Sequence, residues 1–181
     1  NGLFVTVSGN SMQGRSSLIS PCFDFSGMEN PMVSLDIFRS MDPDREGTVL
    51  QYSENGEDWF TLGEVNDGGI NWFNSFQISA EPGGQGTGWT GIQSSDNWLL
   101  AKHVLDNLAG KENIRFRIAF ASDNTSPENR RGFALDKFRI SSRTRKILLE
   151  HFTNASREEY RAVNGDVDYL YTSKYFNDII K

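Results

Sequence analysis

The residue types that catalysis uses most often are scarce in this chain and do not form a recognisable catalytic pattern. Its 181 residues include two histidines, His103 and His151, as candidate bases. No G-x-S-x-G segment supplies the turn that exposes a nucleophilic serine. No E-x-D-x-x-E segment places acids on one strand face, and glycosidases need two carboxylates at a fixed separation. We therefore assign no catalytic residues and expect the chain not to be an enzyme.

Redox and thiolate chemistry are also excluded, because the chain has a single cysteine. Cys22 can form neither an internal disulfide nor a C-x-x-C pair nor a thiolate zinc cage. It lies in SLISPCFDF, and we predict a small buried hydrophobic side chain. The acidic turn with Asp42, Asp44 and Glu46 resembles part of a calcium loop but lacks the rest of that motif, so we predict a solvated turn.

The segment EPGGQGTGWTGIQ, residues 81–93, places five glycines around Trp89. It does not lead from a strand into a helix, and no Lys-Ser/Thr pair follows its last glycine, so a phosphate-binding loop is excluded. Two interpretations remain. Trp89 either packs over a sheet edge as a plug, which we favour, or offers its ring to a ligand.

Tryptophans are the best candidates for ligand contact, because sugars and protein partners both bind aromatic rings on rigid loops. Trp59 closes a hairpin after Asn55-Gly56 and Trp98 begins a strand, so we predict both in the core. Trp72 and Trp89 lie in the long irregular segment 66–97 and are the better candidates for ligand contact, although burial is the interpretation we favour for each.

Charge and hydropathy exclude further classes of function. The net charge of −6 argues against nucleic acid as a partner, because phosphate binding needs a basic face. No run approaches the roughly 18 apolar residues of a membrane-spanning helix. The N-terminal residues lack the features of a signal peptide and an initiating methionine, so we expect an excised piece or a mature fragment.

Short apolar or alternating segments separated by turn residues predict an all-β antiparallel sandwich. The expected strands cover residues 3–7, 17–21, 32–38, 47–53, 59–63, 72–79, 98–105, 113–122 and 132–140. Asn55-Gly56 is a strong hairpin signal. In the last segment the alternation slips at Asp136–Lys137, which predicts a β-bulge.

The sequence changes character after Ile140. A polar, basic linker leads to a strand candidate at residues 146–152 and then to helical periodicity. We therefore expect a β-sandwich over residues 1–142 and a strand–helix extension over residues 143–181.

Five segments carry a family resemblance over roughly residues 10–140. In chain order they are GRSSLISPCFDFSG, VSLDIF, GTVLQYSENGEDWFTLG, IRFRIAFASD and GFALDKFRI. Together they resemble the MAM-like and cleaved-adhesin (choice-of-anchor) jelly rolls of bacterial surface proteins. The resemblance implies a two-sheet jelly roll in a secreted or cell-surface protein, acting as a non-catalytic module that contacts carbohydrate or protein. An accessory domain of an exported protease or glycosidase and a structural spacer are the alternatives.

The same resemblance implies a structural Ca²⁺ bound through the aspartate of the last-strand motif, which is Asp136 in this chain. The chain departs from the pattern at the next position, where Lys137 replaces an acidic neighbour. That change removes one oxygen ligand and adds a repelling charge. No other cofactor is expected.

The C-terminal segment KILLEHFTNASREEYRAVN resembles the start of a thioredoxin-like domain of bacterial surface lipoproteins. The two cysteine positions of that family fall on Arg157 and Tyr160, so thiol–disulfide exchange is not possible here. Only a fragment of such a domain would fit in the remaining residues. A strand–helix remnant packed on the sandwich is the alternative.

Overall fold

The computed structural model describes residues 3–5, 14–123 and 130–142. The chain divides into two compact units, Asn1–Arg143 and Thr144–Lys181. The second unit lies outside the described residues, and so does the expected strand–helix extension. Within the described ranges, no helix is long and apolar enough to cross a membrane.

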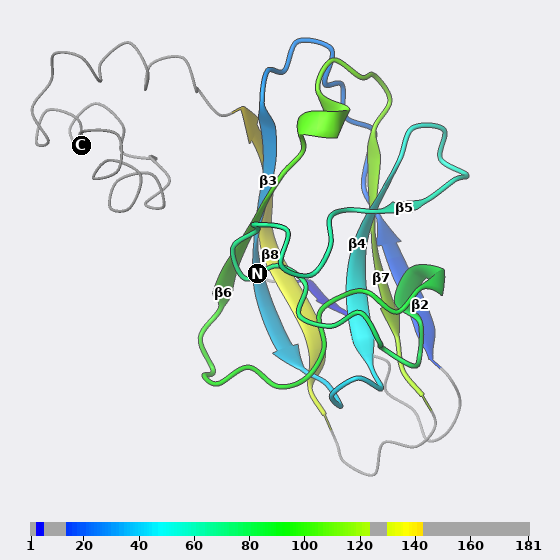
Figure 1. Ribbon diagram of the computed structural model, residues 1–181, viewed down its shortest axis with the longest axis vertical. Helices are drawn as coiled ribbons and strands as arrows, with labels where there is room; N and C mark the ends of the chain where they lie inside the picture. The colour runs from blue at the N-terminus through cyan, green and yellow to red at the C-terminus, as the bar shows by residue number, and fades with distance from the viewer. Residues whose placement is uncertain (1–2, 6–13, 124–129, 143–181) are drawn as a thin grey trace, which may run out of the picture. The chain divides into compact units, whose positions relative to one another are not determined.

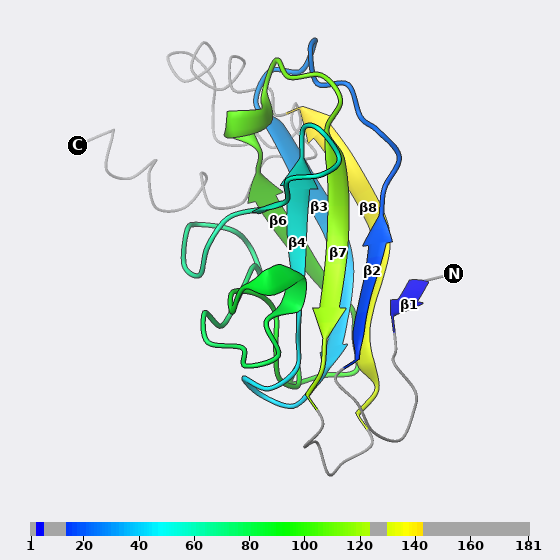
Figure 2. The ribbon, with the colours of Figure 1, turned by 90° about the vertical axis from the view of Figure 1, so that its right-hand side faces the viewer.

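The first unit consists of two four-stranded antiparallel sheets (Figures 1 and 2). The first sheet contains, in spatial order, β1 (Leu3–Val5), β8 (Gly132–Ser142), β3 (Pro31–Ser40) and β6 (Leu99–Val104). The second sheet contains β2 (Arg15–Ile19), β7 (Arg115–Ala121), β4 (Gly47–Ser53) and the short edge strand β5 (Phe60–Thr61). Figure 2 shows the second sheet in front of the first, with the hydrophobic core between them.

The strand pairing is nested in the manner of a jelly roll. β1 pairs with β8, β2 with β7, β3 with β6 and β4 with β5, all antiparallel. One long antiparallel hairpin that folds over into two sheets gives this order, and it is the double-sheet arrangement of jelly rolls. The predicted all-β jelly-roll sandwich is therefore confirmed.

Strand β7 illustrates how the sequence produces the two faces of a sheet. Its side chains alternate, because successive residues of a strand point to opposite faces. Phe116, Ile118 and Phe120 are buried in the core. Arg115 and Arg117 point to the outer face and are only half-buried. The alternation predicted from IRFRIAF is confirmed.

The predicted bulge lies in β8. Asp36 of β3 pairs with Asp136, whereas Ser34 pairs with Arg139, so Lys137 and Phe138 both lie opposite Leu35. Lys137 takes the left-handed conformation at φ 50°. The extra residue explains why the alternation of apolar side chains slips at this point.

The expected strand at residues 72–79 is wrong. Residues 72–79 are irregular, with only isolated bridges such as that between Ser75 and Gly88, and the 3₁₀ turn η1 (Pro82–Gly84) follows them. Trp72, Phe73 and Ile78 are nevertheless buried. A buried loop and a buried strand have the same apolar composition, which is why the sequence pattern did not separate them.

Candidate functional site

Trp72 and Trp89, the candidates for ligand contact, are both buried, which was the favoured interpretation. Trp89 is 1% exposed and Trp72 is 6% exposed, and their rings meet edge to face with centroids 5.0 Å apart. Trp89 also stacks on Phe133, at 5.6 Å. Its Nε1 donates to the carbonyl of Asn71 at 2.9 Å, and Trp72 Nε1 donates to the carbonyl of Leu62 at 2.9 Å. Neither ring has a face for a ligand. The interpretation in which Trp89 offers its ring to a ligand is therefore wrong, and the plug interpretation describes Trp89.

The two tryptophans predicted in the core lie instead at the surface. Trp98 is 41% exposed and meets Phe38 edge to face at 6.4 Å. Trp59 is half-buried, and the Arg117 guanidinium carbon lies 4.5 Å from its ring centroid. The long irregular segment carries Trp72 and Trp89 inward, as the favoured interpretation expected. The core assignment is wrong for Trp98, and Trp59 is only half-buried.

The glycines of residues 81–93 allow the backbone of this segment to approach the second sheet. Trp89 and Thr48 of β4 exchange backbone hydrogen bonds of 2.8 and 2.9 Å. A Cβ atom on Gly88 would lie 2.4 Å from the carbonyl oxygen of Thr48. Only glycine permits this approach, because side chains do not tolerate such a contact.

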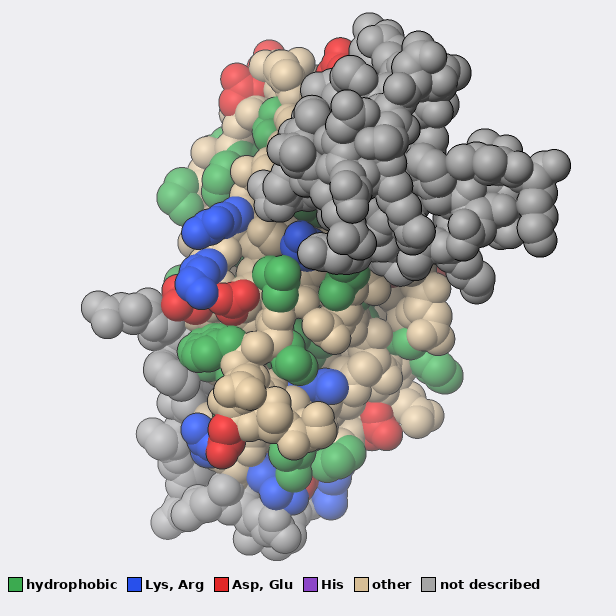
Figure 3. All heavy atoms as spheres, turned by 90° about the vertical axis from the view of Figure 1, so that its left-hand side faces the viewer, with side chains coloured by type: hydrophobic (Ala, Val, Ile, Leu, Met, Phe, Trp, Pro, Cys, Tyr) green, Lys and Arg blue, Asp and Glu red, His purple; other side chains and the backbone are tan. Residues whose placement is uncertain are grey.

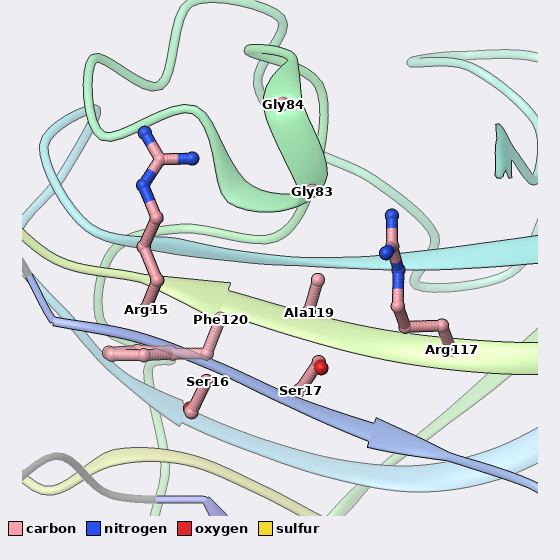
Figure 4. Close-up of a pocket in the computed structure, with 8 residues that line it drawn as sticks. All are labelled: Arg15, Ser16, Ser17, Gly83, Gly84, Arg117, Ala119 and Phe120. Atoms are coloured by element: carbon pink, nitrogen blue, oxygen red, sulfur yellow. The ribbon is translucent and has the colours of Figure 1, made fainter. Parts of the chain in front are cut away.

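A groove lies on the outer face of the second sheet, beside this glycine-rich segment (Figure 4). Its volume is about 310 Å³. The lining residues are Arg15, Ser16, Ser17, Gly83, Gly84, Arg117, Ala119 and Phe120. Figure 4 shows Ser17 and Ala119 on the floor, Arg15 and Arg117 standing apart at the two ends, and the Gly83–Gly84 turn as a wall. None of the lining residues is acidic, so the charge of the groove is positive.

Arg117 is held in place by Gln51, a polar side chain in β4 that is only 2% exposed. Gln51 Oε1 accepts hydrogen bonds from Arg117 Nε at 3.0 Å and from Nη2 at 2.6 Å. Gln51 Nε2 donates to the carbonyl of Gly83 at 3.2 Å. Partial burial lowers the pKa of Arg117, but an arginine remains charged in proteins. Nη1 takes part in neither of the two bonds to Gln51.

Arg15 forms the other end of the groove and is exposed. Its Nη1 donates to the backbone carbonyl of Glu81 at 3.2 Å, which ties the side chain to the glycine-rich segment. Guanidinium groups only donate hydrogen bonds. The two ends of the groove are therefore suited to acceptor groups, and above all to oxyanions.

Sequence reasoning missed this groove, although one signal was present. Gln51 follows the apolar pair Val49–Leu50 in the strand GTVLQYS, and a buried amide side chain needs hydrogen-bond partners. Those partners, Arg117 and Gly83, lie 66 and 32 residues away in the chain, so only the fold reveals them.

The acidic turn is not solvated as predicted. Asp42 is 8% exposed and Glu46 is 9% exposed. Thr90 Oγ1 lies 3.2 Å from the carbonyl oxygen of Asp42 and 2.6 Å from that of Glu46, and the Asp42 backbone N–H donates to Glu46 Oε2 at 3.0 Å. Arg130 Nε lies 3.4 Å from Asp42 Oδ1. Burial, aided by the nearby Asp42 and Asp123, raises the pKa of Glu46, and the turn serves to anchor the glycine-rich segment at Thr90.

Asp136, the expected calcium ligand, lies directly opposite Asp36 on the neighbouring strand. Lys137 Nζ forms an ion pair of 2.7 Å with Asp36 Oδ2, and the Lys137 backbone N–H donates to Asp136 Oδ1 at 2.8 Å. The hydrogen bond that Lys137 donates to Asp36 and the charges of both aspartates raise the pKa of Lys137. Across the part of the chain that the structure describes, no three His, Cys, Asp or Glu side chains form a group that could hold a metal ion.

Of the remaining candidate side chains, His103 and Cys22 lie within the described residues. His103 Nε2 lies 2.7 Å from Asp67 Oδ2 and Nδ1 lies 2.6 Å from the carbonyl oxygen of Val104. The ring thus lies between a carboxylate and a backbone carbonyl, and neither contact is to a serine or cysteine nucleophile. His151 lies outside the described residues. Cys22 is exposed, and the prediction that it is buried is wrong.

The surface around β6 carries side chains of mixed charge. Figure 3, which shows the side of the molecule that carries β6, has basic side chains next to acidic ones and small separate groups of hydrophobic side chains. Leu100 and Val104 of β6, and Trp98 directly before this strand, are exposed hydrophobic residues.

Comparison with protein-family models and with curated proteins finds no match to this chain.

Proposed function

We propose that this chain is a non-catalytic binding module of a larger secreted or cell-surface bacterial protein, and that it holds carbohydrate in the groove between Arg15 and Arg117. The observation that carries the proposal is the groove itself. Its polar side chains are positioned by the fold, because Gln51 fixes Arg117 and the Glu81 carbonyl holds Arg15. Its volume of about 310 Å³ lies at the lower end of the range for small-ligand pockets.

The chemistry of the groove suits sugars. Ring hydroxyls both donate and accept hydrogen bonds, and the groove offers guanidinium donors at its ends and the exposed Ser17 hydroxyl between them. Gly83 and Gly84 have no side chains, so the backbone forms one wall and the groove stays open to an extended chain. Jelly rolls also occur as lectin domains, which is an analogy of fold and supports the proposal only weakly.

Two other functions remain as alternatives. As an accessory domain, the module would hold the same sugar as the substrate of a protease or glycosidase elsewhere in the parent protein. As a structural spacer, it would bind nothing. A spacer has no need for a buried glutamine that fixes an arginine at a surface groove, and for that reason we place it last.

A glycan microarray probed with the 181-residue protein tests the proposal. The groove variant Ser17→Trp places a large ring on the exposed floor, and Ser141→Trp makes the same change at an exposed serine of β8 in the other sheet. We expect the wild type and Ser141→Trp to bind a common set of glycans and Ser17→Trp to lose them. Absence of binding to any glycan would overturn the proposal and favour the spacer. Equal binding by both variants would place the sugar elsewhere on the surface.

A further inference from the structure

The groove has a chemical preference that the proposed function leaves open. Both of its ends are guanidinium groups, and no acidic side chain lines it. A neutral sugar would leave these charges without a counter-charge. An oxyanion, in contrast, forms short, charge-assisted hydrogen bonds with arginine that are about twice as strong as neutral ones.

Both arginines have hydrogen-bonding capacity to spare. In the described part of the chain, Arg15 donates only to the Glu81 carbonyl, and only through Nη1. Arg117 uses Nε and Nη2 for Gln51, which leaves Nη1. The face of the Arg117 guanidinium rests on Trp59, so the group cannot turn away from the groove without losing this contact.

The spacing of the two arginines indicates how many charges the ligand carries. Ile19 pairs with Arg117, so along β2 the position of Arg117 is four residues beyond Arg15, or about 13 Å at the rise of a β-strand. Figure 4 shows the two side chains standing apart rather than converging. A single carboxylate would not meet both, whereas a polymer with repeated charges would.

We infer that the ligand of this groove is an extended acidic polysaccharide, lying along β2 and β7 with one oxyanion at Arg15 and another at Arg117. This inference rests on the proposed function, because it names the class of sugar that the same groove binds. The chemistry shared by the possible ligands is an oxyanion on a sugar chain, which is either a uronic-acid carboxylate or a sulfate ester.

Calorimetric titration of the full chain tests the inference with four ligands. They are polygalacturonate, its carboxyl-reduced neutral counterpart, a sulfated galactan and monomeric galacturonate. We expect at least one acidic polymer to bind, the neutral polymer to bind about tenfold more weakly or not at all, and the monomer to bind more weakly than its polymer. Preference for the uronate or for the sulfated chain would assign the oxyanion. Raising the salt concentration should weaken binding of the acidic chain.

Three variants locate the binding. Arg15→Gln removes an exposed charge at one end of the groove, and we expect it to weaken binding of the acidic polymer about five- to tenfold. Arg117→Lys keeps the charge but loses the planar guanidinium, which can donate to Gln51 and to a ligand at once. We expect it to weaken binding of the acidic polymer about as much as Arg15→Gln does. Arg139→Gln removes an exposed charge from β8 in the other sheet and should leave the affinity unchanged.

The possible failures are distinct. Tight binding of the neutral polymer, lost in Ser17→Trp but unaffected by Arg15→Gln, would overturn the inference and leave the proposed function standing. A loss in Arg139→Gln equal to that in Arg15→Gln would show non-specific attraction and would also overturn it. If no polymer binds, neither acidic nor neutral, the inference and the proposed function fail together.

Discussion

Gln51 Oε1 accepts two hydrogen bonds from Arg117, at 3.0 Å from Nε and 2.6 Å from Nη2. The glutamine is buried in β4, whereas the arginine lies on β7 at the edge of the surface groove. Because its amide nitrogen also donates to the Gly83 carbonyl, Gln51 connects the Arg117 end of the groove to its wall. The rigidity of the groove thus depends on a residue that a ligand does not touch.

Replacing Gly83 should destabilise the protein. A Cβ atom at this position would lie 2.4 Å from Gln51 Oε1, and the backbone has φ 66°. For Gly83→Ala we expect a loss of about 1–3 kcal/mol in the free energy of unfolding, measured by urea denaturation. Gly27→Ala is the control, because a Cβ atom there meets nothing within 4 Å, and its effect should stay within about 0.5 kcal/mol. Equal losses in the free energy of unfolding for the two variants would mean that the turn at Gly83 is not packed tightly against Gln51.

Replacing a buried tryptophan and replacing an exposed one should differ strongly in their effect on the free energy of unfolding. Trp89→Ala removes a ring that is 1% exposed and packed on Trp72 and Phe133, and we expect a loss of about 3–5 kcal/mol. Trp98→Ala removes a ring that is 41% exposed and should cost about 1 kcal/mol, through its contact with Phe38. Urea denaturation of both variants measures the difference. A small effect at Trp89 would contradict its role as a plug.

Glu46 should make stability depend on pH. Burial, first, and the neighbouring Asp42 and Asp123 raise the pKa of Glu46 in the folded protein. An acid whose pKa is raised in the folded state binds more protons there than in the unfolded state. The free energy of unfolding therefore falls as the pH rises from the unfolded-state pKa of Glu46 through its folded-state pKa. Glu46→Gln, which keeps an acceptor for the Asp42 N–H, should lack that fall.

Unfolding curves recorded between about pH 4 and pH 8 for the wild type and Glu46→Gln measure this effect. The control is Glu29→Gln, which removes the same charge at an exposed position and should keep the wild-type profile. Parallel profiles for the wild type and Glu46→Gln would show that Glu46 is not the group responsible.

Calcium should leave the thermal midpoint of the wild type unchanged. The Lys137 ammonium already neutralises Asp36, the carboxylate opposite Asp136, and would repel a divalent cation. Thermal unfolding in EGTA and in excess CaCl₂ makes the comparison, because a ligand bound only to the folded state raises the midpoint. A midpoint that rises with calcium in the wild type but not in Asp136→Asn would contradict this prediction and establish the site implied by the family resemblance.

Local sequence patterns predicted those features that depend on neighbouring residues. Alternation in β7 distinguished Phe116 and Ile118, which face the core, from Arg117, which faces outward. The slip at Asp136–Lys137 corresponds to the bulge in β8. Both follow from the two-residue period of a strand, which is a local property.

The same patterns failed in the irregular segment between β5 and β6. The strand predicted at residues 72–79 does not form, yet Trp72 and Trp89 both belong to the hydrophobic core, the interpretation favoured over ligand contact for each. Burial of a loop residue depends on which sheet the loop crosses, and apolar composition does not encode that choice. The prediction for Trp98 failed for the converse reason, since its strand lies at an edge.

The sequence by itself determined the class of fold, the strand faces and the absence of the usual catalytic motifs. Tertiary structure alone decided the groove. Arg15, Gln51, Gly83 and Arg117 come from four separate segments, and the jelly-roll nesting of β2 with β7 and of β7 with β4 brings them together. Contacts between residues far apart in the chain leave no periodic trace in the sequence, because their pairing is set by sheet order rather than by local spacing.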